Sequence, residues 1–194
     1  MCQAYFESIK VENGVPLHLE YHQRRVDRCS AVNLLHTTDT IPLPNHGIYK
    51  LRISYTPIAV VKVSIEEYSP KTIDTLKIVD GGNVDYSLKY EDRSVLNELH
   101  NQRDLCDDVL IIKAGKITDT SFCNTVFSDG FKWVTPKRPL LEGTCRARLI
   151  CEGKISEEDI TVDDLDRYKY YMLINAMLDF NLNRKKSIDH IVRS

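Results

Sequence analysis

The stretch DDVLIIKAGKITDTSFCNTVF, Asp107–Phe127, organises the second half of this chain. Its first part contains the apolar run VLII and predicts a hairpin that turns at Ala114-Gly115. A second hairpin follows in NTVFSDGFKWVTP, residues 124–136, with Asp129-Gly130 as its tight turn. We therefore expect Asp119 and Asn124 to lie close to the connection between two hairpins.

Helix signals follow this block. PLLEGTCRARLIC, residues 139–151, predicts a helix after Gly143 that carries Ala147, Ile150 and Cys151 on one face. Thr161 and Asp164 have capping-box spacing and predict the start of another helix. The run YMLINAML, residues 171–178, is apolar enough to be buried, but its pattern does not decide between helix and strand.

The block is preceded by a strand, TLKIV, and by YEDRSVLNEL, residues 90–99, which has helical spacing. Further back, YKLRISY and AVVKVSIEEY predict neighbouring strands, and the chain begins with a strand, a turn at Asn13-Gly14 and a helix starting near residues 17–19. The polar segment SPKT, residues 69–72, is the best linker candidate. We expect an α+β protein with a small N-terminal domain, residues 1–70, and a larger domain, residues 71–194.

Composition excludes several classes of protein. The 194 residues carry a net charge of −2, so no basic surface for nucleic acid is indicated. The apolar runs are too short to span a bilayer, and the N-terminus lacks the pattern of a signal peptide. The six cysteines form no CxxC pair and have no finger-like spacing to the histidines. We expect a cytoplasmic protein with reduced thiols, no metal site and no membrane or nucleic-acid partner.

The lysine of VDYSLKYEDRS, Lys89, is the candidate nucleophile. A lysine between leucine and tyrosine either carries its ammonium to water or is held out of water and reacts. Arg25, in HQRRVDR, offers a planar fork for a phosphate or simply lies on a solvated helix face. The residues alone leave both choices open.

The polar residues after these two are equally ambiguous when each is taken alone. Asp119 suits a cationic nitrogen but also an ordinary turn, and the same holds for the amide of Asn124. The helix start at Gly143 exposes the backbone N–H groups of Thr144 and Cys145, which suits a phosphate or is only an ordinary helix entry. Together with Lys89 and Arg25 they describe a pyridoxal phosphate site: a covalent lysine, a phosphate cup with its arginine, and a carboxylate for the ring nitrogen.

In its motifs and in their order along the sequence, the chain resembles the class IV aminotransferases, which are the fold-type IV pyridoxal phosphate enzymes. YFESIKV and the HxxR motif His22–Arg25 are similar to the family's first segment, and DYSLKY to its lysine segment. The block Asp107–Phe127, the helix start in LLEGTCR and the segment LINAM complete the resemblance over nearly the whole chain. It implies the two-domain fold of D-amino acid aminotransferase with a shortened N-terminal domain.

The resemblance also implies roles for single residues. Lys89 corresponds to the catalytic lysine and Arg25 to the arginine on the cofactor phosphate, while Asp119 and Asn124 correspond to the carboxylate of the pyridine nitrogen and the asparagine that follows it. The backbone N–H groups of Thr144 and Cys145 correspond to the phosphate cup, and Asn175 is a further cofactor-binding candidate.

Three positions depart from the family pattern. The family's carboxylate is usually glutamate, whereas Asp119 is one methylene shorter. Cys145 replaces a common threonine, so only its backbone can contact phosphate. Ser94 stands where many transaminases have a tyrosine. In addition, the connection TDTIPLPNHGIYKLR, residues 38–52, is brief where relatives have more, and such regions usually supply ligands for the substrate carboxylate. The resemblance therefore indicates the cofactor site better than the substrate site.

The expected function is pyridoxal phosphate chemistry on an amino acid or related amine. Amino-group transfer to a keto acid is the reaction that we rank first. The alternative is 4-amino-4-deoxychorismate lyase, which eliminates pyruvate, and the compact lysine and cup segments favour that branch. A protein of a different class, which binds the cofactor without turnover, is the third possibility. Family members are commonly homodimers, and a first domain of about seventy residues buries little surface alone, so we expect a homodimer.

Overall fold

The computed structural model describes residues 3–193, and the contacts within it divide the chain into two compact units. The first unit contains the residues up to Pro70 together with the short segment Leu88–Asp92. The second contains Lys71–Ser87 and the residues from Arg93 onward. The boundary after Pro70 lies inside the linker SPKT, and the segment around Lys89 belongs with the N-terminal unit although it follows the linker in sequence.

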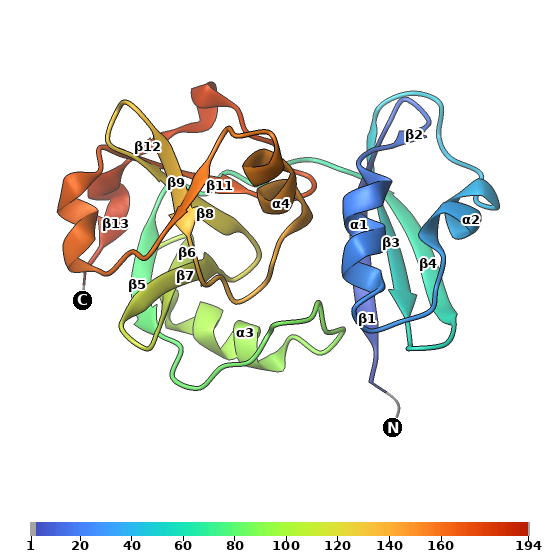
Figure 1. The fold of residues 1–194 in the computed structure, drawn as a ribbon, viewed down its shortest axis with the longest axis horizontal. Helices are drawn as coiled ribbons and strands as arrows, with labels where there is room; N and C mark the ends of the chain where they lie inside the picture. Colours follow the sequence, from blue (N-terminus) through green and yellow to red (C-terminus); the bar gives the residue numbers. More distant parts are fainter. Residues whose placement is uncertain (1–2, 194) are drawn as a thin grey trace. The chain divides into compact units, whose positions relative to one another are not determined.

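The first unit is an antiparallel sheet with two helices (Figure 1). Its strands are ordered β2-β1-β3-β4. Asn13 and Gly14 both have positive φ and close the predicted turn between β1 and β2. The elements are β1 (Tyr5–Glu12), β2 (Val15–Pro16), α1 (Leu19–Val26), α2 (Leu34–Asp39), β3 (Ile48–Tyr55) and β4 (Val60–Glu67).

One face of this sheet forms the core of the unit. Side chains alternate between the two faces of a strand, so Tyr5, Ile9 and Val11 of β1 point to the same side. On that side they pack with Val26 of α1 and Leu34 of α2. Glu7 has the same parity as these apolar residues and is itself completely buried. A charged group therefore lies inside the core, directly under α1.

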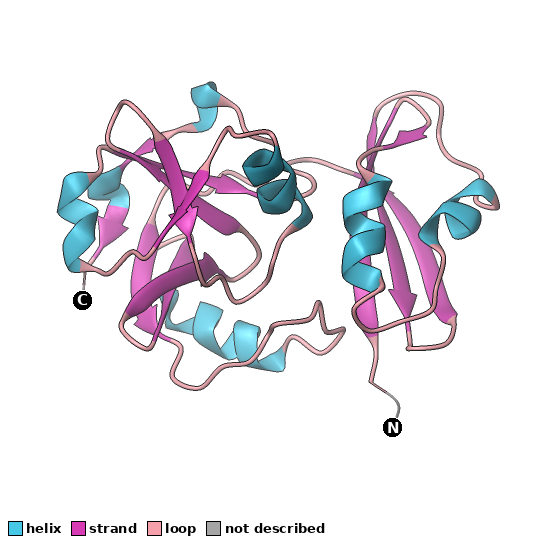
Figure 2. Ribbon diagram, in the orientation of Figure 1, coloured by secondary structure: helices cyan, strands magenta, loops and turns pink. Residues whose placement is uncertain are grey.

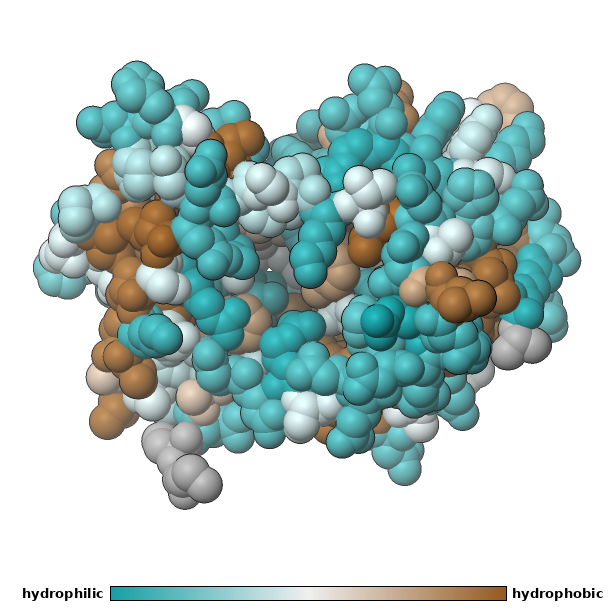
Figure 3. All heavy atoms as spheres, turned by 180° about the vertical axis from the view of Figure 1, so that it is seen from behind, coloured by the Kyte–Doolittle hydropathy of each residue, from teal (hydrophilic) through white to brown (hydrophobic). Residues whose placement is uncertain are grey.

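The surface of the first unit is partly hydrophobic (Figure 3). Ile58, in the turn between β3 and β4, is 85% exposed, and Val61 at the start of β4 is 65% exposed. β4 ends the sheet order and so has one unpaired edge within this unit. Exposed apolar side chains at such an edge are a feature of surfaces that bind another chain.

The second unit is a larger mixed sheet flanked by helices (Figure 2). Its strands are ordered β10-β9-β8-β7-β6-β5-β13, with β11 antiparallel to β8 and β12 paired to β11. The parallel pair β5 and β6 is joined by a crossover that contains α3. The strands are β5 (Leu76–Asp80), β6 (Asp108–Lys113), β7 (Lys116–Thr120), β8 (Asn124–Ser128), β9 (Trp133–Pro136), β10 (Ser156–Glu158), β11 (Tyr170–Ile174), β12 (Lys186–Ser187) and β13 (Ile191–Val192). The helices are α3 (Ser94–His100) and α4 (Thr144–Cys151), with 3-10 turns η1 (Asn101–Arg103), η2 (Asp163–Arg167), η3 (Leu182–Arg184) and η4 (Ile188–His190).

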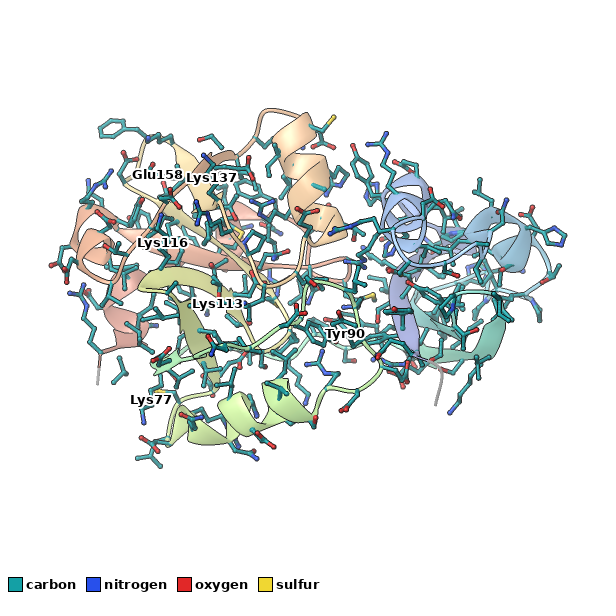
Figure 4. All side chains as sticks on the ribbon, turned by 60° about the horizontal axis from the view of Figure 1, so that its bottom comes forward. Lys77, Tyr90, Lys113, Lys116, Lys137 and Glu158 are labelled. Carbon is teal, nitrogen blue, oxygen red and sulfur yellow. The ribbon has the colours of Figure 1, made fainter. Side chains whose placement is uncertain are left out.

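Both predicted hairpins are confirmed. Lys113 pairs with Lys116 at the ends of β6 and β7, and the two residues between them have positive φ, as a type I′ turn requires (Figure 4). Ser128 pairs with Trp133 across the second turn, in which the carboxylate of Asp129 accepts hydrogen bonds from two backbone N–H groups. Between the two hairpins, the N–H of Thr120 donates to the carbonyl of Cys123 at 2.9 Å, and this tight connection places Asp119 of β7 directly opposite Asn124 of β8.

Three of the sequence expectations need correction or completion. α4 begins at Thr144 as predicted, but Cys151 is exposed, and the buried face of the helix contains Cys145, Arg148 and Leu149 instead. Thr161 and Asp164 make the reciprocal capping bonds, yet only the 3-10 turn η2 follows them. In the undecided run at residues 171–178, the first four residues belong to β11, which ends at Ile174, and the last four form a turn closed by a bridge between Asn175 and Leu178. Within residues 3–193, no helix is long and apolar enough to span a membrane.

Candidate active site

Lys89 lies in a short segment that pairs with the first strand. The N–H of Phe6 donates to the carbonyl of Lys89 at 3.0 Å, and the N–H of Glu91 donates to the carbonyl of Ala4 at 2.9 Å. The ring of Tyr90, which is labelled in Figure 4, packs against the ring of Tyr5 with centroids 5.7 Å apart. The backbone that carries Lys89 is therefore fixed to β1.

The side chain of Lys89 is partly buried against an aromatic ring. Its Nζ lies 4.7 Å from the centroid of the Phe6 ring, and the guanidinium of Arg52 lies 3.6 Å from the same centroid. Arg52 is also paired with Glu91 at 2.9 Å. An ammonium over an aromatic face is attracted to the ring and is partly shielded from water. This arrangement suits a lysine whose stem crosses apolar surface to water as well as a lysine that is held out of water and reacts, the two alternatives that the sequence left open.

Arg25 belongs to a buried cluster in the same unit. Its Nε donates to Oε1 of Glu7 at 2.8 Å and its Nη2 donates to Oε2 at 2.5 Å. Nδ1 of His22, one turn earlier in α1, lies 2.5 Å from Oε2 of Glu7. Arg25 is thus not on a solvated helix face but in the core, where one edge of its guanidinium is held by a carboxylate.

Asp119 is a buried carboxylate held by two donors in the second unit. Its Oδ1 accepts a hydrogen bond from Nδ2 of Asn124 at 2.8 Å, and its Oδ2 accepts one from the backbone N–H of Leu141 at 2.9 Å. Burial raises the pKa of Asp119 to about 6, although these two donors favour the charged form. The group is therefore poised to take or give up a proton near neutral pH.

Asn124 connects this carboxylate to the loop before α4. The Nδ2 group donates one hydrogen bond to Asp119 and another to the carbonyl of Leu141, also at 2.8 Å. A side-chain amide has two N–H hydrogens, so its donor capacity is used. Its Oδ1 packs against Gly143, where an added Cβ would come within 1.9 Å of it. Asn124 can therefore offer a ligand only an acceptor.

The N-terminus of α4 forms the candidate phosphate cup. Its N-cap, Gly143, has no side chain that could occupy the N–H groups of the first turn. Thr144 and Cys145 are both buried. The thiol of Cys145 donates to Oδ1 of Asp179 at 3.6 Å, so its hydrogen is already used and the backbone N–H is the donor that this residue offers a phosphate. Burial, followed by the charge of Asp179, raises the pKa of the thiol to about 12.

Asn175 shapes a turn in the second unit. Its Oδ1 accepts hydrogen bonds from the N–H groups of Met177 and Leu178 at 2.8 and 2.9 Å. Its Nδ2 donates to Sγ of Cys123 at 3.1 Å, next to Asn124 in the chain. This side chain thus connects the turn at 175–178 to the bend before β8. Because both ends of the side chain are used, a cofactor would contact the turn and not the side-chain amide itself.

The structure thus groups Lys89 with Arg25 in the first unit, and Asp119 with Asn124, Thr144 and Cys145 in the second. The residue types fit pyridoxal phosphate: a buried carboxylate suits the ring nitrogen, and a helix start whose cap glycine cannot accept a Cβ suits the phosphate. Sequence reasoning missed the buried partners Glu7 and Leu141. Glu7 could have been found, because it is the charged residue in an inward row of apolar side chains on β1.

Comparison with known proteins agrees with this fold. Residues 61–180 match the model of the amino-transferase class IV family. A protein of Haemophilus influenzae with no characterised function is 38% identical over 182 residues, which cover 89% of this chain and 96% of that protein.

Solved structures of proteins with related names have the same fold. A Haemophilus somnus protein provisionally named a 4-amino-4-deoxychorismate lyase is 34% identical, with a TM-score of 0.84 over 92% of this chain and 98% of that one. A Mesorhizobium loti protein provisionally named an amino-acid aminotransferase has a TM-score of 0.77 at 18% identity, which shows the fold alone, and its whole length is covered. The short first domain is therefore shared with these proteins. The family resemblance and the fold class predicted from the sequence are confirmed, and the chain belongs to the class IV aminotransferase family of enzymes.

Proposed function

We propose that this chain is a pyridoxal phosphate-dependent enzyme that acts on an amino acid or a related amine. The observation that carries the proposal is the buried carboxylate of Asp119, which is held by Asn124 and Leu141 next to the glycine cap of α4. A buried carboxylate is costly unless a cation faces it. A protonated pyridine nitrogen supplies such a cation, and a phosphate on the same ring suits the N-terminus of a helix.

Each site residue has one role in this proposal. When bound, the cofactor supplies a ring that withdraws electrons from the substrate. Lys89 would bond to the cofactor, and once a substrate amine has replaced it there, its freed amine would move the substrate proton as base and acid. Asp119 keeps the ring nitrogen protonated. Arg25 and the backbone N–H groups of Thr144 and Cys145 bind the phosphate. Asn124 holds the carboxylate of Asp119 against the ring nitrogen, and Asn175 shapes a turn that contributes to the cofactor site.

Amino-group transfer to a keto acid is the reaction for which the family is named, and we place it first. The lyase is the second candidate, because the Haemophilus somnus relative at 34% identity carries that provisional name over nearly its full length. Incubating the purified protein with amino donors and a keto acid, and separately with 4-amino-4-deoxychorismate, distinguishes them. New amino acid indicates transfer, and pyruvate released without a keto acid indicates elimination.

The third possibility, binding without turnover, makes a different prediction. The protein would take up pyridoxal phosphate and become yellow, yet neither assay would give product with any donor tested. Failure to bind the cofactor at all contradicts the whole proposal.

The proposal includes a homodimer. The resemblance to the family implies it, and the exposed Ile58 and Val61 on the first unit are the kind of side chains that an interface covers. Size-exclusion chromatography with light scattering measures the mass directly. A mass near that of one chain at micromolar concentration contradicts this part.

A further inference from the structure

The first unit contains a buried charged cluster in which the family resemblance gives a role to Arg25 but none to its partners Glu7 and His22. Glu7, His22 and Arg25 have exposed fractions of 0%, 1% and 6%. Glu7 projects from the inward face of β1, and the other two residues lie one turn apart on α1, which covers that face. Every other side chain of β1 on that face is apolar or aromatic, so this cluster interrupts an otherwise apolar core.

Glu7 accepts hydrogen bonds from both other residues of the cluster. His22 donates to Oε2 of Glu7, and both oxygens of Glu7 accept from Arg25, at Nε and Nη2. A two-point contact between a carboxylate and a guanidinium fixes the plane of the guanidinium as well as its position. The third bond, from His22, fixes the carboxylate itself.

The charge states follow from these contacts. Burial alone would raise the pKa of Glu7, but the charge of Arg25 and the bonds from His22 outweigh it and lower the pKa to about 2. Glu7 is therefore an anion. Burial lowers the pKa of His22, which stays neutral and must carry its proton on Nδ1 to donate to that anion.

We propose that Glu7 and His22 are positioning residues for Arg25: Glu7 sets the plane of the guanidinium and His22 sets Glu7, so that the phosphate of the cofactor meets a guanidinium whose orientation is already fixed. This inference rests on the proposed role of Arg25 as phosphate ligand. Stability alone is a weak reason for the cluster, because a buried ion pair is often no more stabilising than apolar residues of the same volume. Preorganisation is a sufficient reason, since a long side chain ordered in advance loses little freedom when the ligand binds.

The experiment compares the affinity for pyridoxal phosphate with that for pyridoxal, which lacks the phosphate. Glu7→Asp keeps the charge but cannot reach both nitrogens of Arg25, whereas Glu7→Gln keeps the shape and loses the charge. If Glu7 acts by position, both variants lower the preference for pyridoxal phosphate by at least about tenfold. If it acts only by charge, the aspartate variant keeps the preference and the glutamine variant raises it, and the proposal fails.

His22 provides a matched pair of variants. His22→Asn places an amide donor where Nδ1 lies, and His22→Leu removes the donor. We expect the asparagine variant to keep most of the preference, and the leucine variant to lower it by about threefold or more. Equal preferences in the two variants would overturn the role of His22.

Binding of pyridoxal by each variant shows that its pocket is folded, so a loss confined to the phosphate is not a folding defect. If the Glu7 variants do not fold, the His22 pair decides the question. Arg25→Met distinguishes the proposed phosphate role of Arg25 from the proposed positioning by Glu7 and His22. If it keeps the preference, the proposed phosphate role of Arg25 is wrong; if it loses the preference while the Glu7 and His22 variants keep it, only the positioning inference is wrong.

Discussion

The side-chain oxygen of Asn124 lies where Gly143 has only a hydrogen, so that a Cβ at position 143 would approach it to 1.9 Å. Gly143 has φ −68° and ψ 144°, a conformation open to any residue. Glycine is therefore needed there for space and not for backbone freedom. This close approach joins the strand that holds Asn124 to the start of α4.

Gly143→Ala should displace Asn124 and weaken its bonds to Asp119 and Leu141. Overpacking of this kind destabilises a protein by about 1–3 kcal/mol, measured as the free energy of unfolding in urea. The double variant with Asn124→Ala has room for the methyl group, so it should be little less stable than Asn124→Ala alone. Additive effects of the two substitutions would show that the contact does not exist.

Asn124→Ala should affect the ring nitrogen and not the phosphate. The amide hydrogens of Asn124 are committed to Asp119 and Leu141, so its loss leaves the carboxylate less well held. We expect a lower preference for pyridoxal phosphate over its analogue with carbon in place of the ring nitrogen, by about threefold to tenfold. The preference for pyridoxal phosphate over pyridoxal should be unchanged. The reverse pattern would make Asn124 a phosphate ligand.

The raised pKa of Asp119 predicts how the free energy of unfolding of the cofactor-free protein depends on pH. Its folded pKa of about 6 lies above the ordinary value of 3.8, so the folded state binds a proton more tightly than the unfolded chain. Acidification from pH 7 to 4 should therefore stabilise the wild type relative to Asp119→Asn by about 2–3 kcal/mol. Glu7, with a pKa lowered to about 2, has the opposite effect, but mainly below its ordinary value of 4.5.

Urea titrations of both proteins at several pH values measure this difference. A stability difference that does not change between pH 4 and 7 would mean that Asp119 has an ordinary pKa.

Cys145 should be inert and replaceable. Its buried thiol has a pKa of about 12 and points to Asp179, so alkylation at pH 8 should modify the exposed Cys151 and spare Cys145, as peptide mass spectrometry can show. Cys145→Ala should lower the free energy of unfolding by about 1–2 kcal/mol through the cavity that it leaves. Its affinity for pyridoxal phosphate should stay within about threefold, because the backbone N–H remains. A large loss of affinity would give the side chain a direct role.

The turns were the most predictable part of this fold. Asn13-Gly14, Ala114-Gly115 and Asp129-Gly130 all form the expected hairpins, and in each pair the glycine has a positive φ, which glycine adopts without steric cost. The start of α4 was predictable for a similar reason. The residues of the candidate site were predicted from the order of the motifs. That order indicates which residues belong to one site, but it does not indicate their hydrogen-bond partners.

The buried charges were not predictable from the pattern. The face predicted for α4, Ala147, Ile150 and Cys151, left out Arg148, because a charged residue does not fit an apolar pattern. Arg148 is nevertheless buried, and it is paired with Glu152 and Asp179. Glu7 escaped for the same reason. Periodicity sorts residues by polarity, so it fails wherever a tertiary ion pair makes burial of a charge possible.

The central claim is that Lys89 bonds to pyridoxal phosphate, and reduction with borohydride tests it most directly. Treatment of the yellow protein should fix one cofactor per chain, and peptide mass spectrometry should find it on Lys89. Lys89→Arg keeps the cation over the Phe6 ring and serves as the matched control that should remain unlabelled. Labelling of a different lysine, or a protein that takes up no pyridoxal phosphate when it is added, would contradict the account.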